Sequence, residues 1–164
     1  MTSLEESLRE ILIAKATELF EAYGVSCRET DTERIEEVNL CGILGFFGTC
    51  LYGSVVVAAS TDAVAQSNPV TREFDRSWSA ELTNQLVGRF KNELLRRGLE
   101  VSISLPIVLT STRMVPIPEI RIEPIQLLVG DGVARIWLEV EGTAQLDPNA
   151  IADDVPQEGD VLLF

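Results

Sequence analysis

The stretch "NLCGILGFFGTCLYGSVVVAAS", residues 39–60, carries no charged side chain and is long enough to cross a membrane as a helix. Glycines interrupt it at positions 42, 45, 48 and 53, and three consecutive valines follow at 55–57. Together, the glycines and the β-branched run argue for buried strands rather than one continuous helix. Acidic residues precede the stretch at positions 36 and 37, and no basic flank follows it. We therefore predict two buried strands with a turn near residues 49–53, and no membrane span.

Two long amphipathic helices are predicted, one before and one after this hairpin in the sequence. Residues 3–24 place apolar side chains at intervals of three and four, with a hydroxyl at position 2 or 3 as N-cap and Gly24 as the C-terminal stop. Residues 75–97 repeat the pattern and end before Gly98. A short helical turn within residues 60–69 is expected between the hairpin and the second long helix.

Three more strands are predicted after the second helix. Residues 99–111, 119–130 and 133–142 alternate apolar and polar side chains, and the pair "DG" at 131–132 is a hairpin signal. Strands joined by hairpins pair antiparallel. The order of elements predicts an α+β domain in which two long helices pack on a mostly antiparallel sheet.

One domain accounts for most of the chain. The 164 residues are 46% hydrophobic, enough for a single core. Residues 147–164 contain five acidic side chains and no basic one. We expect a folded domain over residues 1–146 and an acidic C-terminal tail over residues 147–164.

Charge and composition exclude several classes of function. The net charge of −13 opposes binding to nucleic acid and to anionic membrane surfaces. The chain has no histidine, so catalysis built on imidazole and the commonest zinc ligand are both absent. Any catalysis must use carboxylates, amides, hydroxyls or a metal brought by a partner.

The cysteines and the N-terminus indicate a reducing compartment. Cys27, Cys41 and Cys50 are odd in number and have no CxxC spacing, so we expect all three to be free thiols in the core. The first residues are acidic and show no secretory signal. The protein is expected to be cytoplasmic.

The second long helix has two distinct faces. At about 100° per residue, one arc is apolar and has Val87 at its margin; it holds Trp78, Leu82, Leu86, Phe90 and Leu94. A second arc, centred roughly opposite, holds Ser77, Glu81, Asn84 and Gly88.

This second face is unusual for a solvated surface. Glycine and asparagine are weak helix formers, and a glycine in a helix interior costs about 1 kcal/mol relative to alanine. Either Gly88 marks close packing against another helix, or the face is left bare so that a partner can approach. In the second case Glu81 and Asn84 are the working groups. An amide is not a base, but it can orient a water molecule, which suffices when the bond to be cut is already activated.

The residues of this helix resemble a known family. "ELTNQLVGRFKNELLRRG" followed by "VSISLPIVL" is similar to the CheX, CheC and FliY class of chemotaxis phosphatases. Their signature is Asp or Ser, then Glu four residues on, Asn three further and Pro about twenty residues later. Those positions here are Ser77, Glu81, Asn84 and Pro106. The glycine-rich hairpin also fits, and the resemblance covers about residues 5–142.

The resemblance implies a CheC-like fold and an activity. It implies a CheX-like phosphatase that hydrolyses the aspartyl phosphate of a CheY-like response-regulator receiver domain. Asn84 would orient the attacking water and Glu81 would pair with the receiver's active-site lysine, while Ser77 and Gly88 would face the partner and Pro106 would be structural. The protein would need no cofactor of its own, because the magnesium belongs to the receiver. A homodimer is implied in the same way.

Two alternatives remain open at this stage. The same scaffold could bind a receiver without hydrolysing its phosphate, in which case Glu81 and Asn84 would be contact residues. It could also be an assembly component of a bacterial signalling or flagellar complex.

Overall fold

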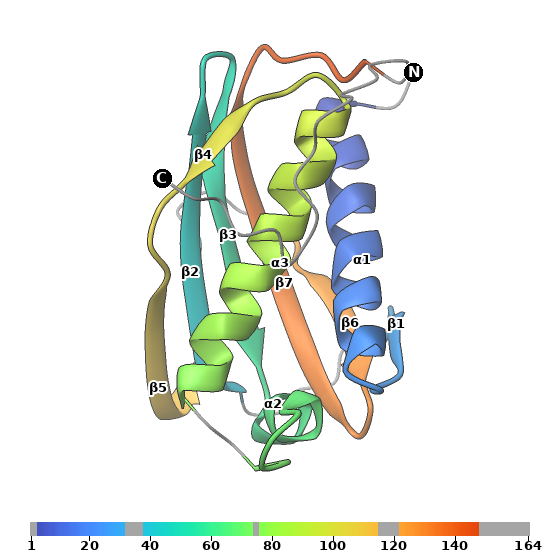
Figure 1. The fold of residues 1–164 in the computed structure, drawn as a ribbon, viewed down its shortest axis with the longest axis vertical. Coiled ribbons are helices and arrows are strands. Elements are labelled where there is room, and N and C mark those ends of the chain that lie inside the picture. The colour runs from blue at the N-terminus through green and yellow to red at the C-terminus, as the bar shows by residue number, and fades with distance from the viewer. Residues whose placement is uncertain (1–2, 32–37, 74–75, 115–121, 148–164) are drawn as a thin grey trace.

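The fold has two long helices, one short helix and a seven-stranded sheet (Figure 1). It was obtained as a computed structural model that describes residues 3–31, 38–73, 76–114 and 122–147. The helices are α1 (Leu4–Ala22), α2 (Thr61–Ser67) and α3 (Arg76–Arg96). The strands are β1 (Cys27–Glu29), β2 (Val38–Gly48), β3 (Leu51–Ala59), β4 (Val101–Ile103), β5 (Ile107–Met114), β6 (Ile125–Val129) and β7 (Gly132–Gly142).

Every strand pair in the described part of the chain is antiparallel, and the strand order is β1-β6-β7-β3-β2-β4, with β5 also on β2. The hairpin β2–β3 is at the centre and pairs Leu40 with Ala59 through to Phe47 with Tyr52. The charge-free stretch is therefore a sheet hairpin, as predicted. No helix in the described residues is long and apolar enough to cross a membrane.

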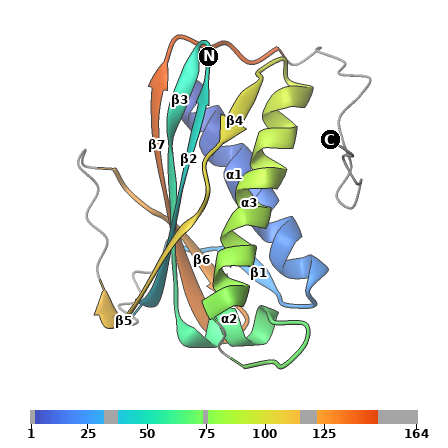
Figure 2. The same cartoon turned by 60° about the vertical axis from the view of Figure 1, so that its left-hand side comes forward.

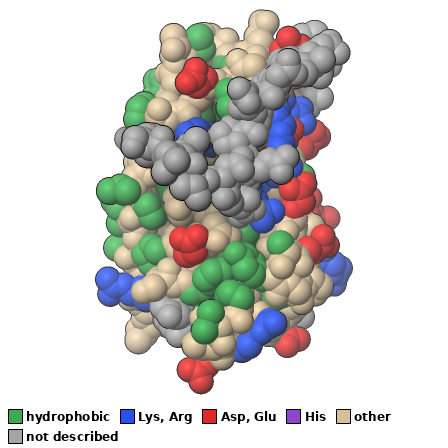
Figure 3. Space-filling view, in the orientation of Figure 1, with side chains coloured by type: hydrophobic (Ala, Val, Ile, Leu, Met, Phe, Trp, Pro, Cys, Tyr) green, Lys and Arg blue, Asp and Glu red, His purple; other side chains and the backbone are tan. Residues whose placement is uncertain are grey.

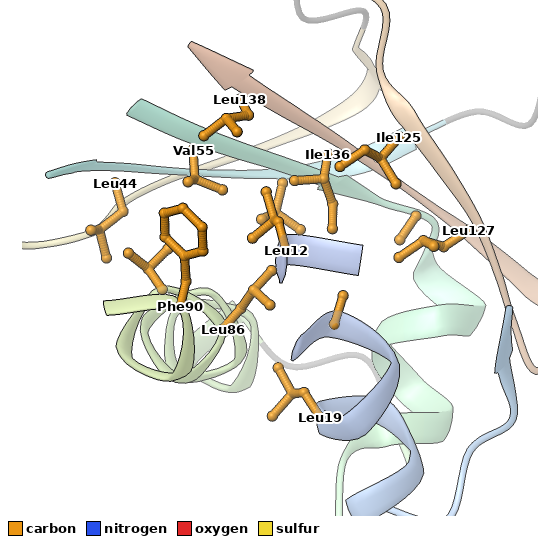
Figure 4. Close-up of a cluster of buried hydrophobic side chains, with 14 of the residues drawn as sticks. Leu12, Leu19, Leu44, Val55, Leu86, Phe90, Ile125, Leu127, Ile136 and Leu138 are labelled. Atoms are coloured by element: carbon orange, nitrogen blue, oxygen red, sulfur yellow. The ribbon is translucent and has the colours of Figure 1, made fainter. Parts of the chain in front are cut away.

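Both long helices cover the same face of the sheet (Figure 2). Between them and the sheet lies one continuous core, in which Leu12 of α1 and Leu86 and Phe90 of α3 meet Leu44, Val55 and Ile136 of the sheet (Figure 4). The predicted α+β architecture is confirmed. Helix α2 lies at one end of the sheet, beside the N-terminal end of α3 (Figure 1).

Local signals in the sequence fix the ends of the helices. Ser3 is the N-cap of α1 and forms a capping box with Glu6, which satisfies two backbone donors at the helix start. Gly24 and Gly98, just beyond α1 and α3, have φ of 75° and 81°, a left-handed conformation that glycine adopts without strain. Ser60 caps α2 through its side chain.

Helix α3 sits directly on strand β2. Ser79 and Thr83 are buried on the sheet side of the helix, and a Cβ built at Gly42 of β2 would overlap the Thr83 side chain. The absence of a side chain at Gly42 therefore sets how closely α3 approaches the sheet. Helical periodicity in apolar residues did not predict this contact, because the residues that form it are small or polar.

An ion-pair cluster around Glu93 joins α1 to α3. The Glu93 carboxylate accepts a hydrogen bond from Arg97 Nε at 3.0 Å and lies 3.5 Å from Lys15 Nζ of α1. Burial alone would raise the pKa of Glu93. The hydrogen bond from Arg97, the charges of Lys15 and Arg97 and a further hydrogen bond from Arg96 outweigh burial, so the pKa lies below its usual value.

Some predicted strands differ from the observed ones. The strand expected over residues 99–111 is two strands, β4 and β5, separated at residues 104–106. Ser104 continues the edge by exchanging hydrogen bonds with Gly45, while Leu105 is 88% exposed and Pro106 has no N–H to donate. Of the strand expected over residues 119–130, only β6 is observed, and residues 115–121 lie outside the described part.

One turn and one short strand also differ. The turn before β7 is centred on Gly130 and Asp131, one residue earlier than the predicted "DG" pair, because Gly130 supplies the positive φ of 55°. Strand β1 was not predicted, since three residues of which only Cys27 is buried leave no periodic signal.

The cysteines were predicted as three core residues, and one of them is not. Cys27 and Cys41 are buried free thiols, whereas Cys50 is exposed in the β2–β3 turn. Burial, reinforced by the charge of Glu21 and partly offset by a hydrogen bond with Thr17, raises the pKa of Cys27 to about 11. Burial also raises the pKa of Cys41.

Candidate functional site

One face of α3 is open to solvent along its N-terminal half. Ser77, Glu81 and Asn84 are exposed and Gly88 is half-exposed, so all four predicted site residues lie on the outer side of the helix. The opposite side is buried and comprises Ser79, Leu82, Thr83, Leu86, Val87, Phe90 and Leu94. We call the open face, made of Ser77, Glu81, Asn84 and Gly88, the α3 ridge.

The predicted core stripe faces the core, with two differences in degree. Trp78 packs against the core but is only half-buried, and Val87, expected at the margin, is fully buried. Both differences have one cause. Helix α3 packs on β2 through Ser79 and Thr83 as well as on α1, so the buried arc of the helix is shifted toward Val87 relative to the predicted arc. The rotation leaves the α3 ridge exposed.

The Glu81 carboxylate is held in place from its own helix. Gln85 Nε2 donates a hydrogen bond to Glu81 Oε1 at 2.7 Å. Gln85 in turn accepts a hydrogen bond at its Oε1 from the Tyr23 hydroxyl, also at 2.7 Å. Tyr23 follows directly after α1, so Glu81 is linked through Gln85 to the end of a second helix.

The same tyrosine packs on the start of α3. The rings of Tyr23 and Trp78 meet edge to face, with centroids 4.8 Å apart and planes at 86°. Trp78 Nε1 donates to Ser67 Oγ of α2 at 3.1 Å, and Ser67 is completely buried. The base of the α3 ridge is thus fixed by α1 and α2 together.

The Asn84 carboxamide is available to a partner. The side chain is exposed, and within the described residues no hydrogen bond engages it. A free carboxamide offers two donors and an acceptor in one plane. It lies one helical turn from Glu81, so the two polar groups point to the same side of the helix.

Gly88 does not mark internal close packing. A Cβ built at Gly88 would meet no described atom within 4 Å. The alternative in which this glycine allows another helix of the same chain to pack closely is therefore wrong for the described structure. The glycine gives no benefit to the packing of its own chain, although it weakens the helix.

Charged side chains are unevenly placed on the face seen in Figure 3. They gather along the right-hand margin, over α1, whereas the lower middle of the view shows an apolar patch with single acidic and basic side chains around it. Among the described residues, no group of three or more His, Cys, Asp or Glu side chains is placed to hold a metal ion.

Comparison with solved structures identifies the fold. The chemotaxis protein CheX from Vibrio vulnificus superimposes with a TM-score of 0.70 at 14% identity, over 85% of this chain and all of that one. The chain has the CheX fold. A CheC-like protein from Shewanella sp. PV-4 gives a TM-score of 0.66 at 16% identity, over 86% and 100% of the two chains.

A third structure with the CheX fold was solved with a partner. It is the complex of CheX with CheY, BeF3 and Mg2+ from Borrelia burgdorferi, and it matches with a TM-score of 0.58 at 13% identity, over 82% of this chain and 97% of that one. By sequence alone, no protein-family model and no curated protein matches the chain significantly. The similarity confirms the expected CheC-like fold.

The sequence analysis did not identify the residues that support Glu81. Tyr23 and Gln85 are 62 positions apart, and their contact depends on how α1 crosses α3. The spacing of Glu81 and Gln85, four residues on one helix, was a signal for a pair of this kind. Pro106, expected to be structural, is half-buried and directly precedes β5.

Proposed function

We propose that this protein hydrolyses the aspartyl phosphate of a CheY-like receiver domain. The observation that carries the proposal is the exposed, unengaged carboxamide of Asn84, one turn from the held carboxylate of Glu81, on a helix of a CheX fold. The solved complex of a CheX with CheY supports a receiver as the partner.

The reaction requires little from this chain. A water oxygen attacks phosphorus, the bond between phosphorus and the receiver's carboxylate oxygen breaks, and inorganic phosphate leaves. The acyl phosphate is already activated, so the water needs orientation rather than a strong base. The Asn84 carboxamide holds the water by accepting from it and donating to a phosphoryl oxygen, which places the water in line.

Glu81 anchors the partner in this proposal. With Oε1 bonded to Gln85, the second oxygen and the remaining lone pairs can accept a hydrogen bond from the receiver's active-site lysine. The magnesium ion that neutralises the phosphoryl charge is brought by the receiver. Ser77 and Gly88 border the contact.

The direct test times the loss of phosphate from candidate receivers. Purified receivers from the same genome are phosphorylated, and their phosphate half-lives are measured with and without the protein. We expect a substoichiometric amount to shorten the half-life of at least one receiver. Unchanged half-lives for all of them would refute the activity.

A binding measurement separates hydrolysis from recognition. The same receivers are held with BeF3 and Mg2+, which imitate the phosphorylated state without being hydrolysed. Tight binding to this form together with unchanged phosphate half-lives would favour the non-catalytic binding module instead.

The resemblance also implies a homodimer, and we propose that it forms at the β4–β5 edge of the sheet. Apolar side chains are exposed there, at Phe47 of β2, Leu105, and Ile107 and Leu109 of β5. Exposed apolar side chains beside a sheet edge are typical of an interface. Light scattering should give a mass of twice 18.0 kDa for the wild-type protein. The substitution Ile107→Glu should reduce the measured mass to that of one chain. A monomer at all concentrations would refute the dimer.

A further inference from the structure

The hydrogen bonds behind Glu81 form a directed chain across two helices. Tyr23 Oη donates to Gln85 Oε1, and Gln85 Nε2 donates to Glu81 Oε1, each over 2.7 Å. A carboxylate only accepts hydrogen bonds, so the Gln85 amide must turn its NH2 group toward Glu81. Its carbonyl then faces Tyr23, which completes the chain by donating its proton.

We propose that Tyr23 and Gln85 are positioning residues that fix the Glu81 carboxylate for the partner. The inference rests on the proposed function and adds two residues to the site. Without Tyr23, the Gln85 amide would lose the group that orients it and could rotate away. Without Gln85, the exposed Glu81 side chain would sample several rotamers and would have to be ordered when the partner binds.

The position of Tyr23 suits this role. Its ring is held edge to face against Trp78, whose indole is bonded to the buried Ser67. The hydroxyl is therefore presented by a rigid, half-buried ring rather than by a mobile side chain. Tyr23→Phe removes only this hydroxyl and keeps the ring contact, so the substitution tests the hydrogen bond and not the packing.

A matched control lies on the other face of the sheet. Tyr52 also donates its hydroxyl to a carboxylate, Glu141 Oε2, over 2.6 Å. Tyr52→Phe removes the same atom from an exposed tyrosine on the face opposite to α3. It should leave activity on the receiver unchanged.

The test measures kcat and KM for phosphate release from an active receiver. Tyr23→Phe and Gln85→Met should each lower kcat/KM by about three- to tenfold, the range expected for one hydrogen bond. The change should fall mainly on KM, because Glu81 acts in holding the partner, whereas Asn84 acts on kcat.

A double-mutant cycle separates positioning from general stability. In a Glu81→Gln background, Tyr23→Phe should have no further effect, because the carboxylate it serves is gone. An undiminished effect in that background, or wild-type kinetics for Tyr23→Phe, would overturn the positioning role. If the wild-type protein is inactive on every receiver, the proposed function fails, and the hydrogen-bond chain is then judged by the spectrum of the free protein, so the two failures are distinguishable.

A second readout needs no partner. The side-chain amide signal of Gln85 in a 1H–15N spectrum of the free protein should move on Tyr23→Phe and on Glu81→Gln, and should stay in place on Tyr52→Phe. A Gln85 signal that is unchanged in all three variants would show that the chain of hydrogen bonds is absent in solution and would overturn the inference.

Discussion

Replacing Gly88 by alanine should make the protein more stable and less active. The added methyl group would meet no described atom within 4 Å, so it costs nothing in packing. Gly88 lies inside α3, which runs from Arg76 to Arg96. Alanine is favoured over glycine in a helix interior by about 1 kcal/mol. For a chain of this length, that corresponds to a rise in Tm of about 2–4 °C.

The same methyl group should hinder the partner. If the receiver approaches the α3 ridge as closely as a bare backbone permits, an extra methyl group in the contact costs about 1–3 kcal/mol of binding. This corresponds to an affinity about 5- to 150-fold weaker. The assay combines thermal unfolding of the free protein with titration of the receiver held by BeF3 and Mg2+.

Gly98 provides the control, because it lies just beyond the C-terminal end of α3 and its φ is 81°. Gly98→Ala should therefore destabilise the protein by about 1–2 kcal/mol through backbone strain, with no direct effect on receiver affinity. A less stable Gly88→Ala protein would show that the glycine serves its own fold, and unchanged affinity would remove Gly88 from the partner contact.

The other predictions concern the support of α3, the thiols and the response to acid. Gly42→Ala should destabilise the protein by about 1–3 kcal/mol in denaturant unfolding, and adding Thr83→Ala should recover part of the loss; full stability of Gly42→Ala alone would contradict the close contact. A thiol reagent should modify Cys50 rapidly in the folded protein and Cys27 only after unfolding. Equal modification rates for the two thiols in the folded protein would contradict the burial of Cys27. Because the pKa of Glu93 is lowered by folding, its stabilising contribution is present above the unfolded pKa and is lost as the pH falls through the folded value. Glu93→Gln should therefore lower stability at neutral pH, and its difference from wild type should shrink in acid; a constant difference would count against the ion pairs.

The general architecture was predictable because it depends on patterns local to the chain. The glycines and valines of residues 39–60 indicated a hairpin, and the helix stops at Gly24 and Gly98 were at the observed places. The bare face of the second long helix was also evident, since Glu81 and Asn84 fall on one side at any regular helical spacing.

What the sequence did not predict depends on contacts between distant elements. Thr83 is buried because Gly42, 41 positions earlier, leaves room for it against the sheet. Tyr23 supports Glu81 only because the end of α1 lies beside α3. Neither pairing has a periodic signal, because each joins one residue to another from an unrelated part of the chain.

The most direct test of the proposed mechanism compares Asn84→Ala with Asn92→Ala on an active receiver. Asn92 is the same residue type on the same helix, about 12 Å further along its axis. Asn84→Ala should bind the receiver held by BeF3 and Mg2+ with near wild-type affinity and melt at the same temperature, but should no longer shorten the phosphate half-life. Asn92→Ala should keep its activity. If Asn84→Ala dephosphorylates the receiver as fast as the wild-type protein, the carboxamide does not orient the attacking water and the proposed mechanism is wrong.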